Sequence, residues 1–131
     1  MAFHESQLQA IRHKDGPMLV LAGPGSGKTT VITHRIQYLV EEYRVEPGSI
    51  LVITFTKAAA QEMKQRFQTL VEGQRFPVSF GTFHAVFFSI LKYAYHYDAS
   101  NIIREEQRVQ IIRELMERYH VDVEDEADFV S

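Results

Sequence analysis

Short apolar runs and longer amphipathic segments alternate along the first part of the chain. Three short runs predict buried strands: MLVLA at 18–22, ILVITF at 50–55 and PVSF at 77–80. Each is followed by a segment with apolar positions at helical spacing, which predicts helices over 28–44, 57–71 and 83–94. Strands that are apolar on both faces and alternate with helices are typical of an α/β fold with a parallel sheet covered on both sides.

Two more helices lie outside this alternation. A short one is expected to start near Glu5, and a last one is expected from about Glu105 to Tyr119. The segment that follows, 121–131, holds five acids and no Lys or Arg. We expect it to be a solvated acidic tail.

The segment AGPGSGKTT, at 22–30, has the form of a phosphate-binding loop between a strand and a helix. Its glycines allow several backbone N–H groups to point at phosphate oxygens, and the positive end of the next helix adds to the attraction. Lys28 is expected to bridge the β- and γ-phosphates, and Thr29 to hold Mg²⁺. The predicted nucleotide-binding residues of the loop are Ala22, Gly23, Pro24, Gly25, Ser26, Gly27, Lys28, Thr29 and Thr30. A glycine-rich turn without a ligand is the structural alternative.

Other polar and aromatic residues suit ligand binding but have structural explanations as well. The amide of Gln7 can offer a donor and an acceptor to an adenine edge, or it can be an ordinary surface residue. Thr56 and Thr82 are expected to cap the helices that follow the second and third strands. A hydroxyl and free N–H groups at a helix start also suit a nucleic-acid phosphate, and the rings of Phe55, Phe83 and His84 could stack on bases.

Composition and charge narrow the protein class. The 131 residues carry 45% hydrophobic residues and suit one domain with a modest core. The absence of Cys excludes disulfides and Cys-based zinc sites and favours a reducing compartment. Neither a leader at the start nor an apolar run of the roughly 18 residues that a membrane span needs is present, so a cytoplasmic protein without membrane contact is expected.

The net charge of −3 hides an uneven distribution of charge. Removing the five acids of the tail from the total of 17 leaves 12 in the first 120 residues, against 14 Lys and Arg. The first 120 residues therefore carry a net charge of +2, which permits nucleic-acid binding without demanding it.

Taken together, these segments resemble the start of a superfamily 1 DNA helicase of the UvrD/PcrA/Rep type. The resemblance rests on Gln7, AGPGSGKTT, ITFTKAAAQEMKQRF at 53–67 and FGTFHAVFFSIL at 80–91, in this order and spacing, and covers about residues 3–95. It implies ATP and Mg²⁺ as cofactors, with Gln7 reading adenine. It also implies contacts to single-stranded DNA by Thr54, Phe55, Thr56, Thr82, Phe83 and His84.

The resemblance also implies domain boundaries and an incomplete set of catalytic residues. Residues 1–98 would be the N-terminal part of the RecA-like, P-loop motor domain 1A, and 99–131 the start of the helical inserted domain 1B with the acidic tail. In that family the catalytic acids, Arg fingers and adenine-stacking Tyr come later in the chain. The expectation is therefore an N-terminal ATP-binding fragment of a 3'-to-5' helicase, whose partners are single-stranded DNA and the remainder of the helicase chain.

Two departures from the family pattern concern single contacts. Thr30 stands where Arg is common after Gly-Lys-Thr, which affects one nucleotide contact. Lys57 and Ala58 stand where Asn-Lys is common, which affects details of DNA affinity. The letters Asp-Glu-Ala-Asp at 125–128 name another helicase group, but the acid-rich residues before them do not form an apolar core strand, so we expect no catalytic pair at Asp125 and Glu126.

Two alternatives belong to other functional classes. The chain could be a binding module that holds nucleotide and catalyses nothing. It could also be a small phosphotransferase of the nucleoside-kinase kind, which would need a lid with several Arg. The segment 85–97 offers one Lys and no Arg.

Overall fold

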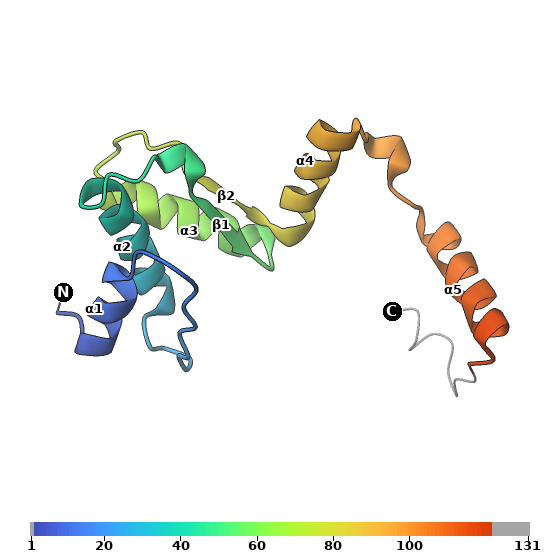
Figure 1. Ribbon diagram of the computed structural model, residues 1–131, viewed down its shortest axis with the longest axis horizontal. Coiled ribbons are helices and arrows are strands. Elements are labelled where there is room, and N and C mark those ends of the chain that lie inside the picture. Colours follow the sequence, from blue (N-terminus) through green and yellow to red (C-terminus); the bar gives the residue numbers. More distant parts are fainter. Residues whose placement is uncertain (1, 122–131) are drawn as a thin grey trace. The chain divides into compact units, whose positions relative to one another are not determined.

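The computed structural model describes residues 2–121 (Figure 1). By its contacts the chain divides into two compact units, Met1–Phe87 and Phe88–Ser131. The elements, in chain order, are α1 Glu5–Arg12, α2 Lys28–Glu41, the short 3-10 helix η1 Pro47–Ser49, β1 Leu51–Thr54, α3 Lys57–Leu70, β2 Ser79–Thr82, α4 Phe83–Tyr95, the 3-10 helix η2 Ala99–Asn101 and α5 Glu105–Tyr119. Within residues 2–121, no helix combines the length and the apolar character that a membrane span requires.

The sheet of the first unit is small and parallel. Strands β1 and β2 pair in register, with Leu51 opposite Ser79 and Thr54 opposite Thr82. The connection between them contains α3, as a parallel pair requires. The parallel arrangement predicted from the alternating pattern is confirmed, and both strands therefore end at the same edge of the sheet.

The main core lies between the sheet and two helices. Val52 and Phe80 face α2 and α3, and they pack around Ile36 and Phe67. Helix α3 contacts both strands, and α2 packs on α3 (Figure 1). Phe67, which is only 2% exposed, is the most deeply buried large side chain. Leu51 points to the opposite face and is 49% exposed, so the predicted covering of both faces is wrong for this strand.

A second, smaller core joins α1 to α2. Ala10 and Ile11 of α1 pack against Val31 of α2, with Phe3 and Tyr38 at the border. This contact places α1 beside the helix that the predicted phosphate loop opens. The short helix expected near Glu5 is confirmed.

The segment 18–22 forms no strand, and that prediction is wrong. Leu19 is 83% exposed and Leu21 is 87% exposed, so the run is open to solvent instead of buried in a sheet. A strand exists only when its backbone groups meet a neighbouring strand. Among the described residues, the two strands pair with each other, so the apolar run at 18–22 has no strand beside it.

The other elements follow the sequence closely. Helix α5 has the predicted bounds, and α2, α3 and α4 match their predicted segments to within a few residues at their ends. The third strand lies at Ser79–Thr82 rather than at 77–80, because the segment before it, Phe76 to Val78, forms a tight turn with a backbone hydrogen bond of 2.8 Å. The predicted acidic tail from 122 onward, including Asp125 and Glu126, lies outside the described residues.

Candidate functional site

The predicted phosphate loop leads directly into α2. Gly27 caps this helix in the left-handed conformation, with φ of 79°, and Gly25 has a φ of 74°. Both conformations favour glycine, and a side chain at either position would strain the backbone. The loop therefore curls as the sequence predicts and presents its backbone at the start of a helix of 14 residues.

Lys28 lies folded over the loop. Its ammonium group donates to the carbonyl of Ala22 at 3.3 Å and to that of Gly23 at 3.2 Å. Both bonds are long and join a cation to neutral acceptors, whereas a phosphate oxygen would be a charged and stronger acceptor. The residue is exposed, so a phosphate group can reach it. The lysine is thus placed to exchange loop carbonyls for phosphate.

Gln7 sits against the same loop, although 19 residues separate it from Ser26 in the sequence. Its Nε2 donates to the Ser26 carbonyl at 3.2 Å, and its Oε1 accepts from the His4 backbone N–H at 2.8 Å. A primary amide has two donor hydrogens and a carbonyl with two acceptor positions. One of each remains after these bonds, so the amide can still pair with a donor and an acceptor on a ligand.

A pocket of about 720 Å³ connects these residues. Gln7 and Ser6 of α1 line one part of it, and Met18, Val20 and Leu21 form an apolar wall. The rest of the lining comes from the loop and the start of α2: Ala22, Gly23, Gly25, Ser26 and Lys28. Small-molecule sites commonly combine such an apolar wall with a few converging polar groups. The volume suits a nucleotide-sized ligand.

Arg35 is a pocket residue that sequence analysis missed. Its guanidinium donates to the carbonyl of Ala10 at 2.8 Å and to that of His13, at the end of α1. Partial burial lowers the pKa of Arg35, an effect partly offset by Tyr43. In the sequence, the one feature that could have pointed to Arg35 is its place directly before Ile36, an apolar position on the buried side of a helix. Through these bonds Arg35 fixes the helix that carries Gln7.

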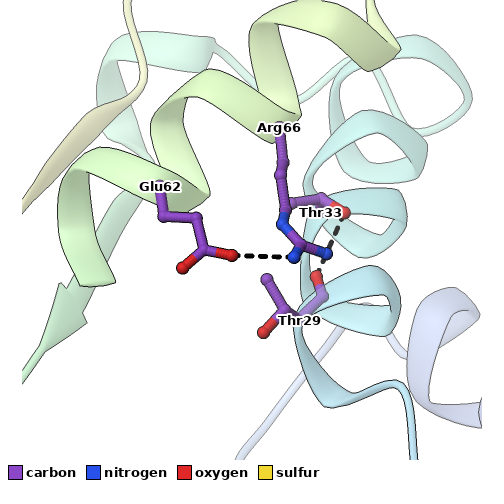
Figure 2. A network of polar contacts seen from close by, with 4 residues as sticks. All are labelled: Thr29, Thr33, Glu62 and Arg66. Carbon is purple, nitrogen blue, oxygen red and sulfur yellow. Dashed lines mark hydrogen bonds and ion pairs between the residues drawn. The ribbon is translucent and has the colours of Figure 1, made fainter. Parts of the chain in front are cut away.

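The first turns of α2 are fixed by a buried hydroxyl (Figure 2). Thr33 is 3% exposed, and its hydroxyl lies 3.1 Å from the carbonyl of Thr29 and 3.0 Å from that of Thr30. Figure 2 also shows the ion pair of Glu62 and Arg66, at 2.7 Å, on α3. The bond from the Thr33 hydroxyl thus holds the backbone of Thr29, the half-buried predicted magnesium ligand, in the first turn of α2.

The fold brings the second group of predicted residues together at the carboxyl edge of the sheet. Thr54 and Thr82 are paired residues at the ends of β1 and β2. The Thr56 hydroxyl accepts from the Ala59 N–H at 3.1 Å, and the Thr82 hydroxyl accepts from the Ala85 N–H at 3.2 Å. Both predicted helix caps are confirmed.

Aromatic side chains border these caps. The rings of Phe55 and Phe83 lie 5.5 Å apart, and Phe55 is 90% exposed. His84, next to Phe83, is also exposed. The residues predicted to contact nucleic acid thus form one surface, although 25 positions or more separate the two segments in sequence.

Comparisons with known proteins identify the family of this chain. The family model of the UvrD/REP helicase N-terminal domain matches residues 3–129. A protein named ATP-dependent DNA helicase PcrA, from Staphylococcus aureus (strain Mu50 / ATCC 700699), is 49% identical over 86 residues, which are 66% of this chain and 12% of that protein. The PcrA of Staphylococcus epidermidis (strain ATCC 12228 / FDA PCI 1200) is 47% identical over 89 residues, 68% of this chain and 12% of the relative.

The chain therefore spans about an eighth of the length of these relatives. The matched region includes the loop, α1 and the edge of the sheet described above. A family model that covers nearly the whole chain establishes the relationship without any appeal to a single motif. The chain belongs to the UvrD/REP helicase N-terminal domain family.

Proposed function

We propose that this chain is the ATP-binding N-terminal part of an ATP-dependent 3'-to-5' DNA helicase that moves along single-stranded DNA. The observation that carries the proposal is the hydrogen bond from Gln7 to the carbonyl of Ser26. It joins a group that can read a base to a loop that can hold phosphates, in one pocket. Such a pairing suits a nucleoside triphosphate better than inorganic phosphate alone.

The residues of the pocket fit Mg-ATP in chemistry as well as in size. The N–H groups at the start of α2 and the ammonium of Lys28 would hold the β- and γ-phosphates, and the hydroxyl of Thr29 would hold Mg²⁺. The amide of Gln7 would pair with the adenine edge. When bound, the metal ion would neutralise part of the phosphate charge.

The domain plan and the DNA contacts are parts of the same proposal. Residues 1–98 would open the RecA-like motor domain 1A, and 99–131 would begin the helical inserted domain 1B. The carboxyl edge of β1 and β2 would meet single-stranded DNA through Thr54, Phe55 and Thr56, at and just after the end of β1. Thr82, Phe83 and His84, at the end of β2 and the start of α4, would meet it as well.

The chain as given is proposed to bind nucleotide without turning it over. Hydrolysis needs an acidic pair that holds Mg²⁺ and orients water, at the end of a core strand. The only such pair suggested by the sequence, Asp125 and Glu126, follows a segment too rich in acids to be a core strand. The remainder of the helicase chain would supply the catalytic acids and the Arg fingers.

Turnover of Mg-ATP by the 131-residue chain, with and without a single-stranded oligonucleotide, tests this proposal. The expected results are background turnover, nucleotide binding that Lys28→Ala removes, and weak binding of the oligonucleotide. Phosphate transfer from ATP to a nucleoside would instead establish the phosphotransferase alternative. DNA-stimulated turnover that depends on Lys28 would contradict the view that the chain lacks its catalytic acids, and would direct mutagenesis to Asp125 and Glu126.

A further inference from the structure

A third phenylalanine extends the aromatic pair at the edge of the sheet. The ring of Phe87 stacks on that of Phe83, with centroids 6.2 Å apart and planes inclined by 25°. Phe83 in turn contacts Phe55 at 5.5 Å. These three rings, here called the aromatic series, are 90%, 41% and 56% exposed at Phe55, Phe83 and Phe87. Three rings in contact and all open to solvent are not a core cluster.

The backbone sets this arrangement. Phe55 follows β1 directly, and Phe83 is the first residue of α4 after β2. Phe83 and Phe87 are four residues apart, so they lie on the same face of the helix, one turn above the other. Phe87 therefore carries the aromatic surface away from the sheet edge and along α4. The predicted DNA-contacting residues stop at His84 and do not include it.

The charges around the aromatic series favour a polyanion. No Asp or Glu occurs in 50–61 or in 77–87, although the whole chain holds 17 acids. The basic residues in those segments are Lys57 and His84. Two segments without acids that carry exposed planar rings suit the two features by which proteins bind single strands, stacking platforms and attraction for phosphates. Bases inside a duplex are already stacked and cannot use such rings.

We propose that Phe87 is a third base-stacking residue, so that the surface holds one more base of a single strand than Phe55 and Phe83 alone could. This inference rests on the proposed function, because it takes single-stranded DNA as the ligand of the sheet edge. Phe87 acts by contact with the base and takes no part in nucleotide binding. Because any base has a flat face, the contribution is independent of sequence.

Binding of a fluorescent oligo(dT) to the 131-residue chain tests the inference through two substitutions of one residue. Phe87→Leu keeps an apolar side chain and removes the ring, so affinity is expected to fall by about fivefold or more, the lower end of measured base–aromatic stacking. Phe87→Tyr keeps the ring and is expected to retain affinity. Tyr93→Leu removes an aromatic side chain of α4 that is 81% exposed and lies outside the series, and should change nothing.

The outcomes separate this inference from the proposed function. If Phe55→Leu weakens binding and Phe87→Leu does not, the third stacking position is wrong and the DNA surface stands. If oligo(dT) binds with an affinity that none of the three rings affects, or does not bind at all, the DNA surface itself is wrong. Far-UV circular dichroism of each variant, matching the wild type, shows that loss of binding is not loss of fold.

Discussion

At the scale of single residues, the amide of Gln7 is the group that we propose selects the base. One donor hydrogen and one acceptor position of this amide remain after its bonds to Ser26 and His4. The Watson–Crick edge of adenine offers the matching acceptor, N1, and donor, N6–H, whereas that of guanine presents a donor and an acceptor in the opposite order. The residue should therefore favour ATP over GTP.

Replacing Gln7 by Ala should reduce this preference. Two lost hydrogen bonds, each worth about 1 kcal/mol, predict a loss of about tenfold or more in the ratio of ATP to GTP affinity. The ratio is the informative quantity, because loosening of the loop at Ser26 should weaken the binding of ATP and of GTP equally. Gln9→Ala, an exposed glutamine on the same helix, is the matched control. An unchanged ratio in Gln7→Ala would exclude a base contact.

Some of the site could be predicted residue by residue, and some could not. The loop residues and the caps Thr56 and Thr82 were identifiable because their chemistry depends on neighbours within a few positions. Arg35 was not, because its partners, Ala10 and His13, lie more than 20 positions away. Its role follows from how α1 packs on α2, which no local pattern encodes.

At the scale of elements, α1 is held in place by a charge at its end. The guanidinium of Arg35 donates to the carbonyls of Ala10 and His13, where the helix leaves acceptors unpaired. The small core of Ala10, Ile11 and Val31 supplies the remaining contact. Because α1 carries Gln7, its position decides whether the amide reaches the loop.

Arg35→Gln is accordingly predicted to lower the free energy of unfolding by about 1.5–3 kcal/mol, the range for hydrogen bonds to a charged group. The affinity for Mg-ATP should fall as well, because α1 and its residue Gln7 are no longer held in place, and not because a phosphate contact is lost. Urea unfolding and nucleotide titration measure the two effects. Arg66→Gln, which breaks the exposed pair with Glu62, should cost about 0.5 kcal/mol or less. Equal effects of the two substitutions would contradict the assigned role of Arg35.

The segment 18–22 shows why an apolar run does not by itself make a strand. Its composition matches that of β1, yet only β1 has a neighbour, β2, with which to pair. Alternation and composition predict burial, but strand pairing depends on residues far away in the sequence. The same reason explains why both faces of the sheet were predicted to be covered, whereas one face is covered in the structure.

Leu19→Thr distinguishes the two descriptions of this segment. At 83% exposure the side chain should contribute little, so the free energy of unfolding is expected to change by less than about 0.5 kcal/mol. A leucine buried in a sheet would instead cost about 2–5 kcal/mol on truncation. Thermal unfolding followed by circular dichroism is sufficient for the comparison. A loss in the larger range would show that the segment is buried in solution.

At the scale of the whole molecule, stability is concentrated in the first unit. The core around Phe67 joins α2, α3 and both strands, whereas the described residues of α4 and α5 include none that is buried. Both the sheet edge and α2, which lines part of the candidate pocket, are built on the elements that share this core. The site therefore depends on it without touching it.

Phe67→Ala should be among the most damaging substitutions. Removing a ring that is 2% exposed leaves a cavity and is expected to cost about 3–5 kcal/mol. Domains of this size have about 5–15 kcal/mol in total, so nucleotide binding should weaken as part of the population unfolds. Tyr95→Ala, at an exposed position, serves as the control. A denaturation midpoint that does not move in Phe67→Ala would contradict the assignment of the core.

We propose that the loop opening α2 grips the phosphates of a nucleotide, and Mg-ATP binding measured by titration calorimetry tests this directly. Lys28→Ala removes charge-assisted bonds worth about 1.5–3 kcal/mol each, so two of them predict a loss of about 100-fold or more. Lys64→Ala, an exposed lysine on α3, is the control and should bind as the wild type does. If Lys28→Ala binds Mg-ATP with wild-type affinity, the loop is not a phosphate site and the proposed function is wrong.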